Sequence, residues 1–139
     1  MEQDVMDLLL GLGPKGMRTQ KIKMRDLSKR AGTDVVFTVR ELGYNEIKDI
    51  HRMEGGRPDG DIAVAVVLAG VREPNLRAAE LRERYSAPTP AELLPKMLSA
   101  GEIDELAMRI ERLSGYRRSV TEIVGDVKKN SMTETGKPS

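Results

Sequence analysis

The residue types that most often carry out chemistry in proteins are scarce in this chain. His51 is its single histidine and there is no cysteine, which excludes thiol nucleophiles, disulfides and zinc thiolate sites. A metal site built on imidazole needs several ligands at fixed spacing, and His51 has no such companions. There is no Gly-x-Ser-x-Gly motif either, so nucleophilic hydrolysis lacks its usual parts. These observations predict a protein without catalytic residues, metal or cofactor, in which His51 lies at the surface or packs.

The acidic residues follow a pattern that is typical of helix surfaces rather than of active sites. Glu80 precedes Arg84, and Glu105 precedes Arg109, each by one helical turn. The glycine-rich stretch Gly11–Gly16 superficially resembles a phosphate loop, but it lacks the Gly-Lys-Ser/Thr ending and does not follow a predicted strand. We therefore predict no nucleotide site there.

The segment from Lys15 to Arg30 is basic, with seven Lys or Arg residues and one acid. It is either the solvated face of a strand or a small nucleic-acid-binding hairpin using Lys21, Lys23, Arg25, Lys29 and Arg30. The composition favours the first interpretation, because the net charge is only +1 and aromatic residues make up 3%.

No membrane association is predicted from the composition. The longest apolar run, Ile62–Val71, is about half the ~20 residues that a membrane span needs. The N-terminus carries Glu2 and Asp4 and has no basic region of the kind that opens a signal peptide. Together with the absence of cysteine, this favours an intracellular location.

The elements begin with a β-hairpin. Polar and apolar residues alternate from Lys21 to Arg25, and Val35–Leu42 is the strongest strand pattern in the chain. Between them, Ser28–Asp34 is predicted to be a polar turn containing Gly32. We expect an antiparallel hairpin over about residues 20–42, closed by Gly43.

Helices are predicted for most of the remaining chain. Asn45–Met53 has inward-facing apolar positions at helical spacing. Ile62–Val71 is apolar almost all round and is predicted to be a central buried helix capped by Asp59 or Asp61, although its β-branched residues leave a strand open. A short charged helix capped by Asn75 should follow.

The clearest helix start is Thr89-Pro90-Ala91-Glu92, which has the form of a capping box with proline at the first helical position. Pro95 should kink this helix or shift its start, and Gly101 is predicted to end it in a left-handed conformation. A second amphipathic helix follows, with one apolar face made by Ile103, Leu106, Ala107, Ile110 and Leu113.

Both ends of the chain carry an apolar stripe. Residues 3–10 predict a short amphipathic helix, which is either a lid over the core or a partner-facing helix. Ser119–Glu122 has the form of a second capping box, and Val120, Ile123, Val124 and Val127 continue as a stripe. From Lys128 onward the chain is polar and free of aromatic residues, which is typical of a disordered tail.

The predicted fold class is therefore α+β and mostly α-helical. A β-hairpin at about 20–42 packs on a bundle of short helices at about 45–127. We expect one globular domain over residues 1–127, including the short N-terminal helix, and a disordered tail over 128–139.

Several stretches, in their order, resemble the XkdN-like phage tail assembly chaperones. They are Phe37–Leu42 with the following Tyr44–Ile47, Val67–Leu76, Ser86–Leu94, Met97–Ile103 and Leu113–Tyr116. The resemblance covers about residues 20–125, and the order of the pieces carries it more than any one of them. The chain departs from the family pattern in the longer, more basic segment at Lys15–Arg30.

This resemblance implies a non-enzymatic protein of contractile-tailed phages, prophages or phage-tail-like particles, acting in the host bacterial cytoplasm. Such a chaperone is expected to bind the tape measure protein, to keep it soluble, to help recruit tail tube protein, and to be absent from the finished particle. Self-association is compatible with this role. Alternatives are a structural tail or baseplate subunit and the basic-hairpin nucleic-acid binder. For the partner-binding surface we select the terminal apolar stripes, Met6, Leu9 and Leu10 with Val120, Ile123 and Val127.

Overall fold

Strand β2 (Val36–Arg40) is the centre of a three-stranded antiparallel sheet in the computed structural model, which describes residues 4–125. Strand β1 (Thr19–Lys23) pairs with β2 in a register that places Ile22 opposite Phe37. On the other side β3 (Val71–Glu73) pairs with β2 across a bulge, with Val39 opposite Val71. The predicted hairpin is confirmed, whereas the third strand was not predicted because three residues are too few to show a period.

The connection between β1 and β2 contains a helix, so the prediction of a polar turn there is wrong. Helix α2 (Arg25–Ala31) ends at Gly32, which adopts the left-handed conformation at a φ of 75°. Tertiary contacts hold this short helix in place. The Leu27 amide donates to Glu102, at 3.1 Å, and the Arg30 guanidinium donates to the carbonyl of Met97, at 2.7 Å.

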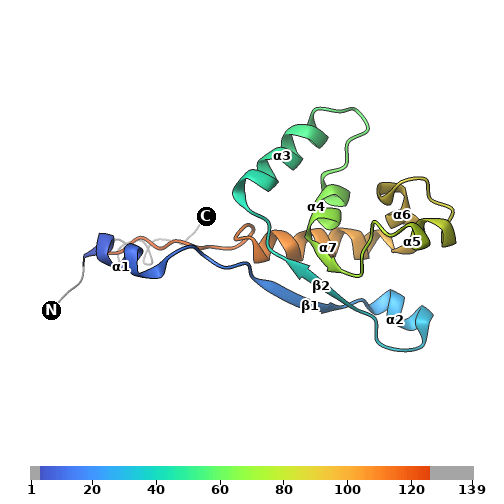
Figure 1. The fold of residues 1–139 in the computed structure, drawn as a ribbon, viewed down its shortest axis with the longest axis horizontal. Helices are drawn as coiled ribbons and strands as arrows, with labels where there is room; N and C mark the ends of the chain where they lie inside the picture. Colours follow the sequence, from blue (N-terminus) through green and yellow to red (C-terminus); the bar gives the residue numbers. More distant parts are fainter. Residues whose placement is uncertain (1–3, 126–139) are drawn as a thin grey trace, which may run out of the picture.

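Helix α4 (Ile62–Gly70) lies at the centre of the helical part, between α3, α6 and α7 (Figure 1). It begins at Asp61, whose carboxylate accepts from the Val64 amide at 3.0 Å, and Val66 and Val67 are fully buried. The prediction of a buried helix is confirmed, with Asp61 as its cap. Its contact with α7 is close, because a Cβ atom added to Gly70 would lie 2.6 Å from Cδ1 of Ile110.

Helices α6 and α7 both begin at a residue whose hydroxyl accepts a hydrogen bond from the backbone amide three positions later. Helix α6 (Pro90–Met97) begins as predicted, with Thr89 Oγ1 accepting from the Glu92 amide at 3.1 Å, and it continues through Pro95. Helix α7 (Ala100–Leu113) begins with a complete capping box between Ser99 and Glu102. Gly101 therefore lies inside α7, and the prediction that it ends α6 is wrong. The predicted apolar face of α7 is confirmed, with four of its five residues buried.

The two remaining helices lie at the edges of the bundle. Helix α3 (Tyr44–Gly55) matches its predicted position and buries Ile47. Helix α5 (Ala79–Arg84) is short, and it begins after Ala78 rather than after Asn75. Asn75 instead accepts from the Arg77 amide at 3.0 Å, which forms a turn before the helix.

Both ends of the described chain leave the body of the fold (Figure 1). Helix α1 (Val5–Leu12) has no buried residue, so the interpretation of this helix as a lid over the core is wrong. After Leu113 the chain has turns and extended segments up to Gly125, so the predicted helix following Ser119–Glu122 does not form there. The helical bundle therefore ends at Leu113, and the predicted tail at 128–139 lies outside the described residues.

Candidate partner interface

Helix α1 presents an apolar surface that no other part of residues 4–125 covers. Asp4 caps it by accepting from the Asp7 amide at 2.9 Å, and six of its eight residues are large apolar side chains, each at least half exposed. The residues selected from the sequence lie on this helix, with Met6, Leu9 and Leu10 exposed by 63%, 59% and 74%. Isolated helices of this length are marginal in water and gain stability by packing an apolar face against something else.

The segment after α1 carries the helix away from the body. Gly13 ends α1 at a φ of 70°, and every residue from Gly13 to Lys21 is exposed. Before the chain enters β1, Lys15 and Arg18 contact Glu41 just beyond the end of β2. The attachment of the N-terminal arm, by which we mean residues 4–17, therefore depends on the surroundings of Glu41.

Glu41 is a buried carboxylate that accepts hydrogen bonds from Arg18, the residue that follows the arm. Its Oε2 accepts from the Arg18 backbone amide at 2.9 Å, and its Oε1 accepts from the Arg18 guanidinium at 3.3 Å. The Lys15 ammonium lies 3.9 Å away. These hydrogen bonds, the backbone one first, lower the pKa of Glu41 against the opposing effect of burial. The carboxylate is therefore ionised at neutral pH and fixes the start of β1.

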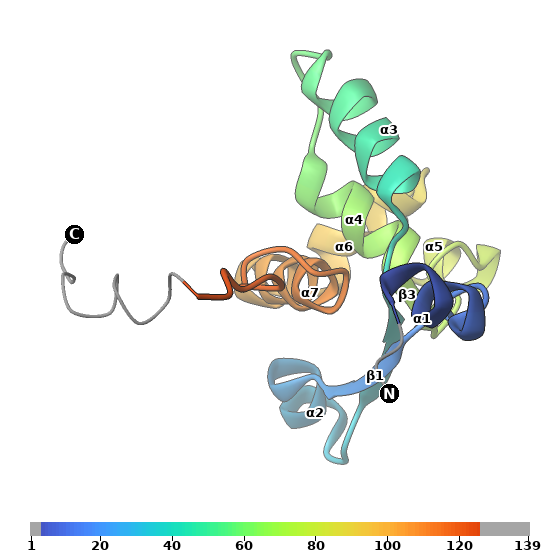
Figure 2. The same cartoon turned by 90° about the vertical axis from the view of Figure 1, so that its left-hand side faces the viewer.

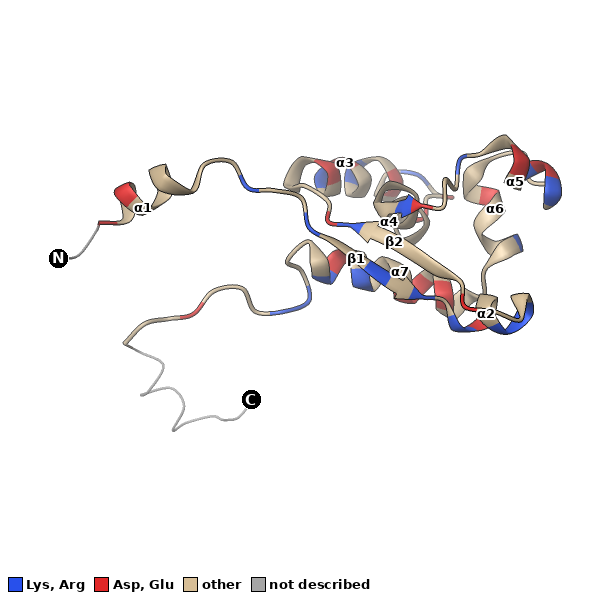
Figure 3. Cartoon of the chain, turned by 60° about the horizontal axis from the view of Figure 1, so that its bottom comes forward, with Lys and Arg blue, Asp and Glu red and all other residues tan. Residues whose placement is uncertain are grey.

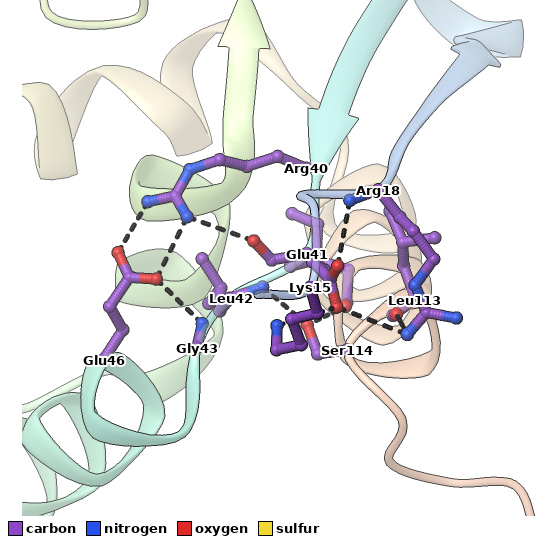
Figure 4. A network of polar contacts seen from close by, with 10 residues as sticks. Lys15, Arg18, Arg40, Glu41, Leu42, Gly43, Glu46, Leu113 and Ser114 are labelled. Atoms are coloured by element: carbon purple, nitrogen blue, oxygen red, sulfur yellow. Dashed lines mark hydrogen bonds and ion pairs between the residues drawn. The ribbon is translucent and has the colours of Figure 1, made fainter. Parts of the chain in front are cut away.

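The same cluster also holds the end of α7 (Figure 4). Arg18 donates to the carbonyl of Leu113 at 2.7 Å, and the Leu42 amide donates to Ser114 Oγ at 2.8 Å. Ser114 in turn donates to the carbonyl of Ile110 at 2.7 Å. The residues that follow the N-terminal arm and those that precede the C-terminal segment, residues 116–125, are thus joined at one end of the molecule.

A second ion pair fixes the start of α3 beside this cluster. The Arg40 guanidinium donates to both oxygens of Glu46, at 3.0 and 2.6 Å, and Glu46 also accepts from the Gly43 amide at 2.8 Å. The hydrogen bonds from Arg40 and then Gly43 lower the pKa of Glu46 to about 2, although burial opposes them. The sequence did not reveal the Glu41 cluster, because its members are brought together only by the packing of β1, β2 and α7. Arg40 and Glu46 are only six residues apart and meet where β2 leads into α3.

The C-terminal segment, residues 116–125, is the second exposed apolar stretch. Arg117 pairs with Glu111, and Arg118 donates to the carbonyl of Arg112 at 2.7 Å, which holds its root against α7. Val120 and Ile123 are exposed by 61% and 59%. The sixth selected residue, Val127, lies outside the described residues. Figures 2 and 3 show α1 and this segment following separate courses, so the structure does not join the two selected stripes into one surface.

The basic residues of the first hairpin are divided between internal and exposed roles (Figure 3). Arg30 bonds a carbonyl of α6, and Lys23 pairs with Asp34 at 3.2 Å. Lys21, Arg25 and Lys29 are exposed. Two of the five basic residues that a nucleic-acid-binding hairpin would use therefore make contacts within the chain.

A groove runs between β1 and α7. Its larger part, about 420 Å³, is lined by Ile22, Met24 and Leu106 among charged residues of both elements. A smaller hollow of about 290 Å³ continues it at Gln20, Leu113 and Arg118. Arg109 lines both parts.

Among residues 4–125 there is no group of three or more His, Asp or Glu side chains arranged to hold a metal ion. No helix in that range is long and apolar enough to cross a membrane. His51 lies exposed on α3.

No curated protein matches this chain. Among solved structures, the crystal structure of the protein yqbn has the same fold, with a TM-score of 0.59 and 19% identity, over 84% of this chain and 99% of that one. The sequence profile described as "Phage XkdN-like tail assembly chaperone protein, TAC" matches residues 12–128. Because this match spans most of the chain, the protein belongs to the family of XkdN-like phage tail assembly chaperones.

Proposed function

We propose that this chaperone binds the tape measure protein in the cytoplasm of the host bacterium and keeps it soluble until the tail tube assembles. It works by contact, without catalysis or a cofactor. It also helps to recruit tail tube subunits, and it is released before the particle is complete. The single observation that supports this proposal most is the exposed apolar surface of α1.

The physical argument concerns what such a surface can bind. A contiguous set of large apolar side chains on a soluble protein marks a site for another apolar surface. A long helical client that awaits assembly exposes apolar stripes, and a short apolar helix can lie along a stripe in the manner of a helix in a groove. We therefore propose Met6, Leu9 and Leu10 as the contact residues for the tape measure protein.

Co-expression with the tape measure gene of the same genome tests this proposal. The full chain should raise the soluble fraction of the tape measure protein and co-purify with it. The double substitution Leu9→Asp and Leu10→Asp should weaken the complex at least about tenfold, because burying two leucines contributes roughly 3–6 kcal/mol. A matched control is Met53→Asp, since Met53 on α3 is exposed by 57%, a fraction close to that of Leu9.

Two results would contradict the proposal. One is a tape measure protein whose solubility is unchanged by the wild-type chain. The other is an equal loss of binding for the Met53 control and for the α1 variant, which would place the contact elsewhere. Recruitment is tested by adding purified tail tube subunits to the complex and measuring whether they join it only when the chaperone is present.

Mass spectrometry of purified particles separates this role from that of a structural tail or baseplate subunit. We expect the chain to be absent from the finished particle and present in lysates during assembly. A stoichiometric amount in the particle would favour the structural role.

A further inference from the structure

Within residues 4–125, strand β1 is an edge of the sheet and has unpaired backbone groups. Arg18 accepts from the Glu41 amide and Met24 donates to the carbonyl of Val35, both at 2.9 Å. Because an antiparallel ladder alternates, the N–H and C=O groups of Thr19, Lys21 and Lys23 point away from β2. A row of such groups is a template for one more strand.

The chain also contains an extended segment without a sheet. Residues Ser119–Val124 are all exposed, and they form neither helix nor strand. Four of the six are β-branched (Val120, Thr121, Ile123 and Val124), which is the composition of a strand. Ile123 is 59% exposed, so the segment has an apolar side chain that nothing else in residues 4–125 covers.

The course of this segment leads away from its own β1. The contacts of Arg117 with Glu111 and of Arg118 with the Arg112 carbonyl hold the root along α7. After Arg118, the segment continues past the end of the body and away from β1 (Figures 1 and 3). It would have to reverse at Ser119 to reach the edge strand of the same chain, whereas a second copy can approach it without that reversal.

We propose that Ser119–Val124 of one copy adds to the free edge of β1 in a second copy as a fourth strand. The second copy returns the same contact, so that the exchange closes a symmetric dimer with one kind of interface. The match in length supports this, since β1 has five residues and the segment has six. The proposal does not depend on the identity of the client protein.

Side-chain chemistry agrees with this pairing. When the centres of the two strands are aligned, Glu122 lies opposite Lys21 on the outer face, beside Lys23, which gives a favourable cross-strand charge pair. The alternation then turns Ile123 inward, toward Ile22 and the groove of about 420 Å³ between β1 and α7. Pairing of β1 with the β1 of another copy is less favourable, because the lysines at positions 21 and 23 of both copies would then gather on one face of the paired strands.

Sedimentation of the full chain over a range of concentrations tests the proposal. The wild-type protein should form a dimer, and Glu122→Lys should raise its dissociation constant at least about tenfold, because like charges then face each other. Lys21→Glu should do the same, and the two substitutions together should restore the dimer. Both side chains are exposed in the single chain, so circular dichroism should show an unchanged fold. A wild-type chain that stays monomeric, or variants that dimerise equally well, would overturn the proposal.

Cysteine cross-linking identifies which copy supplies the strand, and the absence of native cysteine makes this direct. Mixed Lys21→Cys and Glu122→Cys chains should form a heterodimeric disulfide, because Cα atoms of hydrogen-bonded pairs lie about 5.5 Å apart, within disulfide range. The control mixture of Met53→Cys with Glu122→Cys should show background cross-linking only. A chain that carries both Lys21→Cys and Glu122→Cys should likewise cross-link between copies. Disulfides formed only within single chains of this double variant, or heterodimeric disulfides no more abundant than in the control mixture, would overturn the exchange.

Discussion

Glu41 and Glu46 are two carboxylates whose ionised forms the fold stabilises. Glu41 lies just after β2, and Glu46 lies in the first turn of α3. Each accepts hydrogen bonds from an arginine and from a backbone amide. The pKa of Glu46 is about 2 in the folded chain, compared with about 4.5 for an unperturbed glutamate. A lowered pKa contributes stability that is fully present above the unfolded value and is lost as the pH falls toward the folded value.

We therefore expect the free energy of unfolding to fall as the pH is lowered from about 5 toward 2, with Glu46 contributing to the loss. Glu46→Gln should reduce this acid dependence, measured by urea denaturation at several pH values. The effect should be modest, because the Glu46 side chain is 45% exposed and solvent screens the pair. Arg40→Met should have a similar effect, and the double variant should add little to either. Identical acid profiles for the wild type and Glu46→Gln would contradict this.

Two glycines in helices α4 and α7 distinguish tight packing from open surface. An added methyl group at Gly70 would lie within 3.0 Å of three atoms of the buried Ile110 side chain, whereas at Gly101 nothing lies within 4 Å. Gly70→Ala should therefore destabilise the protein by about 1–3 kcal/mol through overpacking. Gly101→Ala should be neutral or stabilise it by up to about 1 kcal/mol through helix propensity. Chemical denaturation measures both, and a Gly70→Ala protein as stable as the wild type would mean that α4 and α7 are not closely packed.

The errors in the element predictions have physical causes at this same scale. Gly101 does not end α6, because Ser99 and Glu102 form a capping box around it and place it in the first turn of α7. Ser119–Glu122 has similar cap chemistry without a helix, because Val120 and Ile123 have no core to pack against. A cap contributes about 1 kcal/mol, which does not offset the cost of nucleating a helix whose apolar face stays in water.

For the whole molecule, α1 should be separable from the fold. None of its residues is buried, so deletion of residues 1–13 should change the free energy of unfolding by less than about 0.5 kcal/mol. The same deletion should abolish binding of the tape measure protein under the proposal above. Urea denaturation and co-purification measure the two effects separately. A loss of more than about 1 kcal/mol would show that α1 packs on the body.

The local pattern alone determined where most helices and both hairpin strands form. Thr89, Asp61 and the stripe of α7 are local signals, since a cap or an amphipathic face involves residues within a few positions of one another. The tertiary structure decided everything that joins distant residues. Examples are the bonds of Arg18 and Glu41 to each other, of Leu42 to Ser114, and of α2 to Glu102. It also decided that α1 and Val120–Ile123 remain exposed. Whether an apolar stripe packs into a core depends on the space that all other elements leave. The periodicity of the stripe itself contains no information about that space.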